Sequence, residues 1–435
     1  MTQDIGKDGN NGRTITIGDA IGTLMKHGMP VRFTAYDGSS AGPADAAVGL
    51  HLRNERGLSY ILTAPGDLGI ARAYVMGDLE VSGVHPGNPY DGLVLLLSQL
   101  SFRRPSAGEA LRLLRGLGLG HLKPPPVPPQ EHLPRWRRAV EGLRHSLTRD
   151  AEVIGHHYDV SNRFYELVLG PSMAYTCALF ETEDATLEQA QAAKFDLVAR
   201  KLDLQPGQRL LDVGCGWGGM VMHAAREYGV KALGVTLSLE QASWAKAAID
   251  AAGLSDLAEV RHLDYRDVMD DGFDAVSSIG LTEHIGVRNY PAYFAFLRDR
   301  LRPEGRLLNH SITRAHNLPT RTGAFIDRYV FPDGELTGSG RMVMDAQDAG
   351  LEVQHTENLR MHYARTLQGW SENLERNWDD AVAEVGEGTA KVWGIYMTGS
   401  RIAFERNEIQ LHQVLATRTD DRGVSGYPLR HTFGA

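Results

Sequence analysis

Two cysteines in 435 residues are the scarcest feature of this sequence. A disulfide framework needs more, so Cys177 and Cys215 indicate a reducing compartment, and we expect a cytoplasmic protein. No run of eighteen apolar residues occurs, so no segment is predicted to span a membrane. The polar stretch 1–13 is followed by no apolar region of the kind that signal peptides have.

Positive charge is also in deficit, since 45 Lys and Arg stand against 54 Asp and Glu, for a formal net charge of −9. This charge excludes nucleic-acid binding by the molecule as a whole on electrostatic grounds. The stretch 101–150 departs from the rest, with ten basic and four acidic residues, several Leu, Trp136 and a proline-rich run at 123–129. Such a stretch suits either an anionic membrane surface or a solvated, semi-rigid linker, and both interpretations stay open.

The length allows two or more domains with a sizeable core. Before residue 100, periodicity and turn signals predict a small α+β unit. Its helices are expected at 15–27, 66–76 and 90–100, and its strands at 31–35, 47–52 and 60–63. We therefore expect an N-terminal α+β domain at 1–120, a basic and proline-rich linker at 121–150, and a second domain at 151–435.

A glycine-rich turn stands near the start of the second domain. Residues 210–213 form a short apolar run that contains Asp212, and helical periodicity follows at 220–228. Between them stand three glycines at a spacing of two: Gly214, Gly216 and Gly218. Glycines at a strand-to-helix turn let the backbone approach a ligand closely, and the helix start offers free N–H groups. The motif favours a nucleotide-type cofactor site over a tight turn without a ligand.

Strands and helices alternate through the rest of this domain and predict a doubly wound, mainly parallel α/β sheet. The expected strands are 209–213, 232–236, 258–263, 273–279 and 306–311. Ligands of such sheets bind at the carboxyl ends of the strands, which directs attention to Gly214, Thr236, Asp264, Glu283 and His310. The end of the second strand lacks the acid that often holds a ribose, and Thr236 and Gln241 stand there instead.

Four further segments make the pattern specific: 157–162 (HYDVSN), 175–178 (YTCA), 234–241 (GVTLSLEQ) and 283–286 (EHIG). Together with the glycine turn they resemble the cyclopropane-fatty-acyl-phospholipid synthase family. That family includes the mycolic-acid methyltransferases and the actinobacterial enzymes that make 10-methylene and 10-methyl fatty acids. The resemblance covers residues 151 to about 415 and extends more weakly over the N-terminal domain, which resembles the extra, lipid-associated domain of the long members.

The resemblance implies a class I S-adenosylmethionine-dependent methyltransferase that acts on the double bond of an unsaturated, oleoyl-type acyl chain of a phospholipid. Methyl transfer leaves a carbocation, so the site must exclude water and supply a base. In the family a bound bicarbonate is that base, and no metal is implied. By motif match its holders are Cys177, Glu283, His310 and Tyr363, with a backbone contact at Ile279.

The resemblance also assigns the cofactor contacts. They are Tyr158, Tyr175 and Thr176 at the sulfonium and carboxylate, Gly214, Gly216 and Gly218 along the methionine part, Thr236, Leu237 and Gln241 at the ribose, and Asp264 and Tyr265 at the adenine. Three departures stand out, since relatives often have Gly-Trp at 264–265, Ser at 176 and an aromatic residue at 179. After Thr313 the chain is expected to leave the sheet, with 325–332 and 370–377 covering an apolar acyl tunnel.

Two other classes of function were weighed: a small-molecule N- or O-methyltransferase, and a lipid-binding protein without activity on the same scaffold. The first needs no Cys/Glu/His/Tyr set, and the second would tolerate broken glycines. Either a cyclopropane or a 10-methylene product fits the same residues, and we favour the methylene. The resemblance implies phospholipid and the inner face of a membrane as partners, and it leaves room for a homodimer and for a reductase acting on the product.

Overall fold

The computed structural model describes residues 15–131, 160–318, 322–332 and 334–433. Contacts within the chain divide it into two compact units, Met1–Pro129 and Gln130–Ala435, and the division falls inside the stretch predicted as a linker. Among the described residues, no helix combines the length and the apolar character that crossing a bilayer requires.

The first unit contains a four-stranded sheet in the order β2-β1-β3-β4, in which β1 and β3 run parallel and the other pairs antiparallel. Its strands are β1 (Arg32–Ala35), β2 (Ser40–Ala41), β3 (Gly49–Leu52) and β4 (Leu79–Ser82). Its helices are α1 (Ile17–Leu24), α2 (Glu55–Thr63), α3 (Asp67–Val75), α4 (Tyr90–Gln99), α5 (Ala107–Leu117) and the short η1 (Leu119–Leu122).

The predicted strand at 60–63 is wrong, because these residues end helix α2. The side chain of Asn54 accepts a hydrogen bond from the Gly57 N–H at 3.0 Å and so begins the helix. A four-residue apolar run has no periodicity of its own that separates a strand from a buried helix, and the cap decides. The strands β2 and β4 were not predicted.

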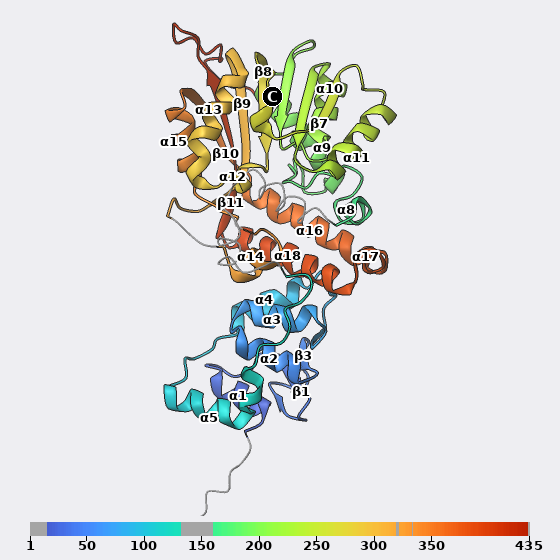
Figure 1. Cartoon of the computed structure of the whole chain (residues 1–435), viewed down its shortest axis with the longest axis vertical. Helices are drawn as coiled ribbons and strands as arrows, with labels where there is room; N and C mark the ends of the chain where they lie inside the picture. The colour runs from blue at the N-terminus through green and yellow to red at the C-terminus, as the bar shows by residue number, and fades with distance from the viewer. Residues whose placement is uncertain (1–14, 132–159, 319–321, 333, 434–435) are drawn as a thin grey trace, which may run out of the picture. The chain divides into compact units, whose positions relative to one another are not determined.

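The second unit is built on a seven-stranded sheet in the order β10-β11-β9-β8-β5-β6-β7 (Figure 1). Five strands are parallel: β5 (Arg209–Val213), β6 (Lys231–Thr236), β7 (Ala258–His262), β8 (Phe273–Ile279) and β9 (Leu301–Arg314). The two others, β10 (Leu351–Asn358) and β11 (Ile409–Arg418), are antiparallel to their neighbours. The expectation that the chain leaves the sheet after Thr313 is therefore wrong, since it re-enters twice, and β11 pairs with residues 306–314 of β9.

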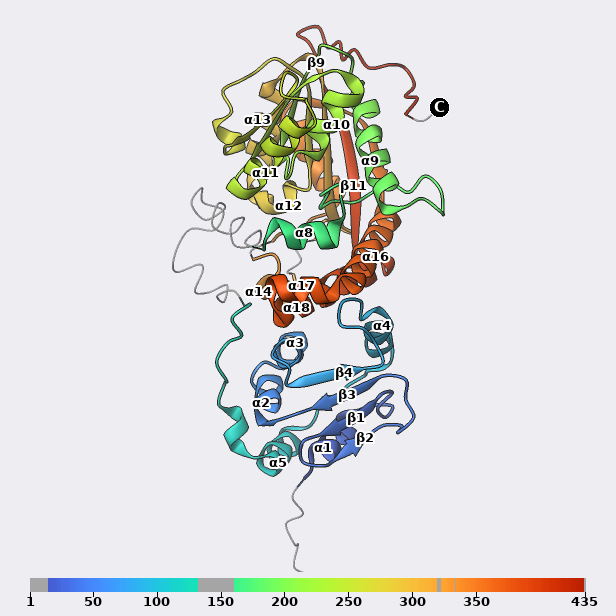
Figure 2. The same cartoon turned by 90° about the vertical axis from the view of Figure 1, so that its right-hand side faces the viewer.

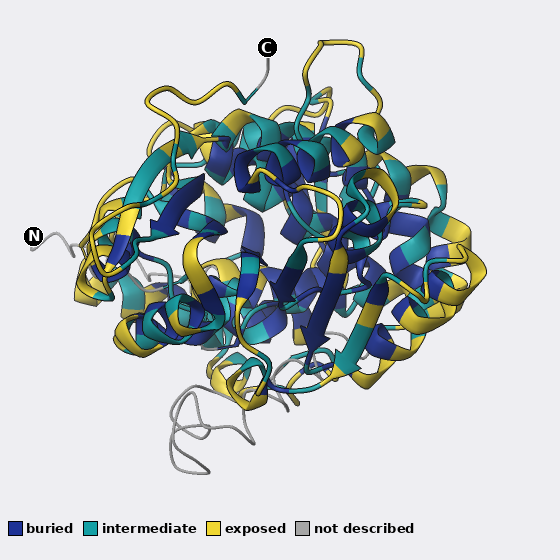
Figure 3. Ribbon diagram, turned by 90° about the horizontal axis from the view of Figure 1, so that it is seen from above, coloured by how far each residue is buried: buried dark blue, intermediate teal, exposed yellow. Residues whose placement is uncertain are grey.

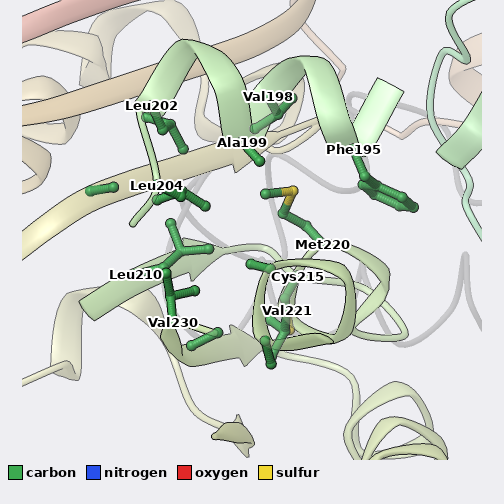
Figure 4. Packing of buried hydrophobic residues seen from close by; sticks show 14 of the residues in the cluster. Phe195, Val198, Ala199, Leu202, Leu204, Leu210, Cys215, Met220, Val221 and Val230 are labelled. Atoms are coloured by element: carbon green, nitrogen blue, oxygen red, sulfur yellow. The ribbon is translucent and has the colours of Figure 1, made fainter. Parts of the chain in front are cut away.

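Helices cover both faces of this sheet, and the strands between them are mostly buried (Figure 3). One core lies against α9 (Leu187–Leu202), α10 (Gly219–Tyr228) and α11 (Leu239–Ala251), where Val198 and Leu202 pack towards Leu210 and Met220 (Figure 4). The other core lies against α13 (Tyr290–Arg300) and α15 (Ser339–Asp348). Burial on both faces explains why the parallel strands read as nearly continuous apolar runs.

A group of helices gathers at the end of the sheet where the parallel strands finish (Figures 1 and 2). They are α8 (Asn162–Leu169), α12 (Thr282–Ile285), α14 (Ala324–Tyr329), α16 (Arg360–Arg376), α17 (Trp378–Val385) and α18 (Glu387–Glu405). Segments 325–332 and 370–377, predicted as a cover, belong to α14 and α16 with the residues that follow each. This arrangement places helical side chains over the carboxyl ends of the strands.

Candidate functional site

The glycine turn between β5 and α10 provides open backbone at the carboxyl end of the sheet. Gly214, Gly216 and Gly218 have φ values of 72°, 55° and 79°, which favour glycine. The N–H groups of Gly214 and Cys215 both donate to the Val235 carbonyl at 3.0 Å, which ties the turn to β6. A Cβ on Gly216 would meet no atom within 4 Å, so space for a ligand adjoins its backbone.

Two buried groups of opposite charge type, Asp212 and Lys194, lie near this turn. Burial raises the pKa of Asp212 and lowers that of Lys194, while the attraction between the two groups acts against both shifts. The Ser277 hydroxyl donates to Asp212 Oδ1 at 2.6 Å, and Lys194 Nζ donates to Thr176 Oγ1 at 3.0 Å. Thr176, a predicted cofactor contact, is thereby held by a buried lysine of α9.

At the end of β6 the predicted ribose residues form a closed local network. The Thr236 hydroxyl donates to Gln241 Oε1 at 2.7 Å, and the Gln241 N–H donates to the capping hydroxyl of Ser238 at 3.2 Å. The Leu237 carbonyl lies 3.1 Å from His262 Nε2. Thr236 and Gln241 are both buried.

At the end of β7 the side chains of the predicted adenine pair, Asp264 and Tyr265, already contact other residues of the chain. Both Asp264 oxygens accept from the Arg266 guanidinium, at 2.9 and 2.7 Å, and Oδ1 also accepts from the Arg266 N–H. Tyr265 packs edge-on against Tyr293 and Phe296, with ring centroids 5.5 and 5.3 Å apart. Asp264 and Tyr265 follow the carboxyl end of β7, and Asp264 caps a short helix.

Three of the predicted anion-binding residues meet where β8 ends. Ile279 and His310 are register partners in β8 and β9, and the Gly280 N–H donates to the His310 carbonyl at 2.8 Å. Beyond that point β8 has turned away, and the next inward N–H of β9, that of Ile312, donates to Glu283 Oε1 at 2.6 Å. The carboxylate thus takes the place of the missing strand.

Two polar atoms of this group are buried without a partner among the described residues: Glu283 Oε2 and His310 Nε2. Burial raises the pKa of Glu283 to about 7, against the stabilising N–H of Ile312. Burial, with Lys194 and Lys201 nearby, lowers the pKa of His310 well below its usual value. A neutral imidazole and a carboxyl group that titrates near neutrality therefore share this end of the sheet.

Cys177 and Tyr363 are brought together by Leu359. Cys177 Sγ donates weakly to the Ala178 and Leu359 carbonyls, at 3.2 and 3.8 Å, and the Tyr363 N–H donates to the same Leu359 carbonyl at 3.2 Å. Burial raises the pKa of the Cys177 thiol, and Lys194 opposes that shift. The thiol is therefore neutral at physiological pH, a weak donor or acceptor and no nucleophile.

Aromatic rings line the helical side of the same region. The Tyr175 hydroxyl donates to the Tyr396 hydroxyl at 3.0 Å, and the Tyr175 ring lies between Trp370 and Trp393, with centroids 5.4 and 5.7 Å away. Tyr165 joins the group through Trp217, at 4.7 Å. Such ring faces stabilise cations, and a sulfonium or a carbocation is one.

Sequence reasoning missed several of these residues: Tyr165, Trp217, Trp393, Tyr396, Lys194, Lys201 and Gln413. The lysines left a signal, because Lys194 and Lys201 stand seven residues apart on the face of α9 that also carries Val198 and is buried. Tyr158 lies outside the described residues. No cluster of three His, Cys, Asp or Glu suited to a metal ion occurs in the part of the chain that the structure describes.

Comparisons with known proteins agree with this geometry. A family model described as mycolic acid cyclopropane synthetase matches residues 145–414. A probable fatty acid methyltransferase of Mycobacterium tuberculosis is 62% identical over 402 residues, which cover 92% of this chain and 94% of the relative. The cyclopropane-fatty-acyl-phospholipid synthase of Escherichia coli strain K12 is 34% identical over 63% of this chain and 70% of its own length.

Among solved structures, the mycolic acid cyclopropane synthase CmaA1 complexed with SAH and CTAB is 35% identical. It matches with a TM-score of 0.58 over 61% of this chain and 97% of that chain. The glycine turn, the strand-end residues and these matches agree, and the chain belongs to the mycolic acid cyclopropane synthetase family of S-adenosylmethionine-dependent methyltransferases.

Proposed function

We propose that this enzyme transfers the methyl group of S-adenosylmethionine to the double bond of an unsaturated, oleoyl-type acyl chain in a membrane phospholipid. The observation that carries the proposal is the pair of orphaned buried atoms, Glu283 Oε2 and His310 Nε2, on neighbouring segments at the end of the sheet. Relatives named for fatty acids and for phospholipid acyl chains support the same substrate class.

The residues present fit a small planar oxyanion. Bicarbonate offers acceptor oxygens for an imidazole N–H, a phenol and a protonated carboxyl group. Glu283 and His310 each have one buried polar atom to satisfy, and a neutral imidazole beside a carboxyl that titrates near 7 avoids repulsion of the anion. Cys177, Tyr363 and the backbone at Ile279 complete the proposed holders. When bound, bicarbonate supplies the base that takes the proton.

In the proposed reaction the alkene π electrons attack the sulfonium methyl carbon, and the carbon–sulfur bond breaks with its electron pair passing to sulfur. S-adenosylhomocysteine leaves, and a carbocation remains on the acyl chain. Tyr175, Trp370 and Trp393 face this region with their rings and exclude water, which would quench the cation. Glu283, His310 and Tyr363 orient the base that removes the proton.

For the product we propose a 10-methylene fatty acid. A 1,2-hydride shift moves the cation to the methyl-bearing carbon, and loss of a methyl proton gives the exocyclic double bond. Ring closure with loss of the same kind of proton would give a cyclopropane instead. The methylene is supported by two relatives named fatty acid methyltransferase, which cover 92% and 90% of this chain, whereas the synthases named for cyclopropane cover 63% and 59% of it.

We also propose that the first unit helps to hold the enzyme at an anionic membrane surface. Large apolar side chains are exposed at Phe102, Leu111, Leu119 and Leu122, with exposed fractions of 54%, 45%, 57% and 42%. Exposed basic residues stand between them: Arg104, Arg112, Arg115 and Lys123. Apolar and basic side chains in alternation suit the boundary between head groups and acyl chains. Arg135, Trp136, Arg137 and Arg138, also predicted to contribute, lie outside the described residues.

The test is incubation of the full chain with methyl-labelled S-adenosylmethionine and oleoyl phosphatidylglycerol vesicles. We expect label in the extracted lipid and, after ozonolysis, the keto acid that an exocyclic methylene gives. Label that enters the lipid but resists ozonolysis would identify a cyclopropane and overturn the product. Label that enters added amines or alcohols and never lipid would establish the alternative, a small-molecule N- or O-methyltransferase.

A further inference from the structure

A buried chain of hydrogen bonds leads from α9 through β11 to His310. The ammonium of Lys201 is sealed from solvent, and its Nζ donates to Gln413 Oε1 at 2.6 Å. It also forms an ion pair with Glu357 on β10. At the other end of the same amide, Gln413 Nε2 lies 3.1 Å from His310 Nδ1.

The direction of every hydrogen bond in this chain follows from Lys201. An ammonium group only donates hydrogen bonds. The Gln413 atom that faces it must therefore be the carbonyl oxygen and not the amide nitrogen. The NH₂ of Gln413 then faces His310, and since an NH₂ also only donates, Nδ1 of His310 must accept. Nδ1 therefore carries no proton.

His310 is neutral, because burial and the charges of Lys194 and Lys201 lower its pKa well below the usual value. A neutral imidazole has one N–H, and with Nδ1 unprotonated that N–H is at Nε2. Nε2 is the buried atom of His310 that meets no partner in the described parts of the chain, and Glu283 Oε2 is in the same condition nearby.

We propose that Lys201 and Gln413 are positioning residues that hold His310 in its Nε2–H tautomer, so that His310 presents a hydrogen-bond donor to an anion bound between it and Glu283. The opposite tautomer would turn a lone pair towards the anion and repel it. The inference rests on the proposed function only for the identity of that anion.

The charge of Lys201 fixes the orientation of the Gln413 amide and so the direction of each hydrogen bond in the chain. The two orientations of a glutamine amide have the same shape, so packing alone does not choose between them. Without Lys201 the amide can turn over, and Oε1 then accepts from a proton on Nδ1. A buried lysine costs free energy through desolvation, which Glu357 offsets only in part, and an apolar residue would fill the same space on α9 without that cost.

The direct test is nitrogen NMR of the full chain labelled with ¹⁵N-histidine, which distinguishes protonated from unprotonated ring nitrogens. A His310→Gln variant assigns the His310 signals by their loss. We expect a protonated Nε2 and an unprotonated Nδ1 in the parent chain and in Lys201→Arg, which keeps a group that only donates. In Lys201→Met and Gln413→Leu we expect protonation to move towards Nδ1.

Kinetics give the second readout. With oleoyl phospholipid vesicles, kcat of Lys201→Met should fall at least about tenfold while the S-adenosylmethionine Kd stays within about twofold, and Lys201→Arg should recover most of the loss. If both Lys201→Met and Gln413→Leu keep the Nε2–H tautomer, the proposal is overturned, even where these variants are less stable. Should one variant not fold, the other carries the same test.

The failure of the proposed anion would look different. If adding bicarbonate to the parent chain leaves the His310 Nε2 signal unshifted while the tautomer is as expected, the identity of the anion is wrong and the positioning role of Lys201 and Gln413 stands.

Discussion

The two halves of the catalytic sheet solve opposite problems. In the cofactor half, β5 to β7, the polar side chains that the motif match assigns are already hydrogen-bonded to neighbours within a few residues, as Thr236 is to Gln241. In the anion half, β8, β9 and β11, buried polar atoms of Glu283 and His310 lack partners among the described residues. In the first half the polar side chains are already hydrogen-bonded, and free space adjoins the backbone of Gly216. The second contains unpaired polar atoms that the proposed anion would satisfy.

This difference predicts separable effects, with cofactor affinity depending on one half and proton removal on the other. The largest effect is expected for Gly216→Val. A branched side chain would enter the open space beside the turn and strain a backbone with φ of 55°, so S-adenosylmethionine affinity should fall at least about a thousandfold. Calorimetry checks it. Gly253→Val is the control, because Gly253 also has positive φ and open space but ends α11 away from the turn. If a folded Gly216→Val variant bound S-adenosylmethionine as tightly as the parent, the cofactor would not bind at this turn.

In the anion half, Tyr363→Phe removes one hydroxyl and leaves the ring packed on Phe404. If that hydroxyl orients the base, kcat should fall roughly a hundredfold, as a displacement of about 1 Å can cause, with the cofactor Kd unchanged. Tyr228→Phe is the matched control, since the Tyr228 hydroxyl donates to Asp196 of α9 and is not part of the proposed anion site. An unchanged kcat in Tyr363→Phe would take this residue out of the set.

The buried carboxyl group of Glu283 should also affect the free energy of unfolding. The folded-state pKa of Glu283 is raised to about 7, so the fold is favoured while Glu283 is protonated and loses free energy of unfolding as pH rises from about 4.5 through 7. Without ligand, Glu283→Gln should therefore be more stable than the parent by about 2 kcal/mol at pH 8 and by little at pH 5. Urea unfolding at both pH values measures this, with the exposed Glu227→Gln as control. A stability difference that does not grow with pH would contradict the buried, ligand-free carboxyl.

The smallest effect concerns the first unit, which neither half of the sheet includes. Replacing Arg112 and Arg115 with Glu should weaken sedimentation with phosphatidylglycerol vesicles about tenfold and leave cofactor affinity intact. Lys231→Glu with Lys246→Glu, exposed on the second unit, gives the same change in net charge. Added salt should weaken the parent as well. If both double variants lost vesicle binding to the same extent, the effect would come from net charge and not from the position of Arg112 and Arg115.

The same comparison explains what could be predicted from the sequence. The cofactor half is local: Gly214, Gly216 and Gly218 announce a turn within five residues, and β5, β6, β7 and β8 were predicted within a residue or so of their bounds. The proposed anion site would join Cys177, His310 and Tyr363 across nearly two hundred residues, and only the family resemblance suggested that they act together. The structure explains why, since contacts such as His310 with Gln413 depend on β11, which periodicity did not separate from the helices before it.

Two misreadings have the same physical cause. Strand β11, which mixes apolar and polar residues, and the end of helix α2 both depend for their identity on what they pack against, not on their own pattern. Lys201 was passed over because a lysine near a helix end is usually solvated, and only the surrounding buried face of α9 shows otherwise.

The central claim is that cofactor binding and proton removal reside in different halves of the sheet, and Glu283→Gln tests it most directly. The variant keeps the shape of the side chain and changes only its charge and donor pattern. Cofactor Kd by calorimetry and kcat on oleoyl phosphatidylglycerol vesicles would be measured on the same preparation. The account predicts a Kd within about twofold of the parent and a kcat lower by at least about a hundredfold. A near-parent kcat, or a Kd that rises in step with the loss of activity, would contradict it.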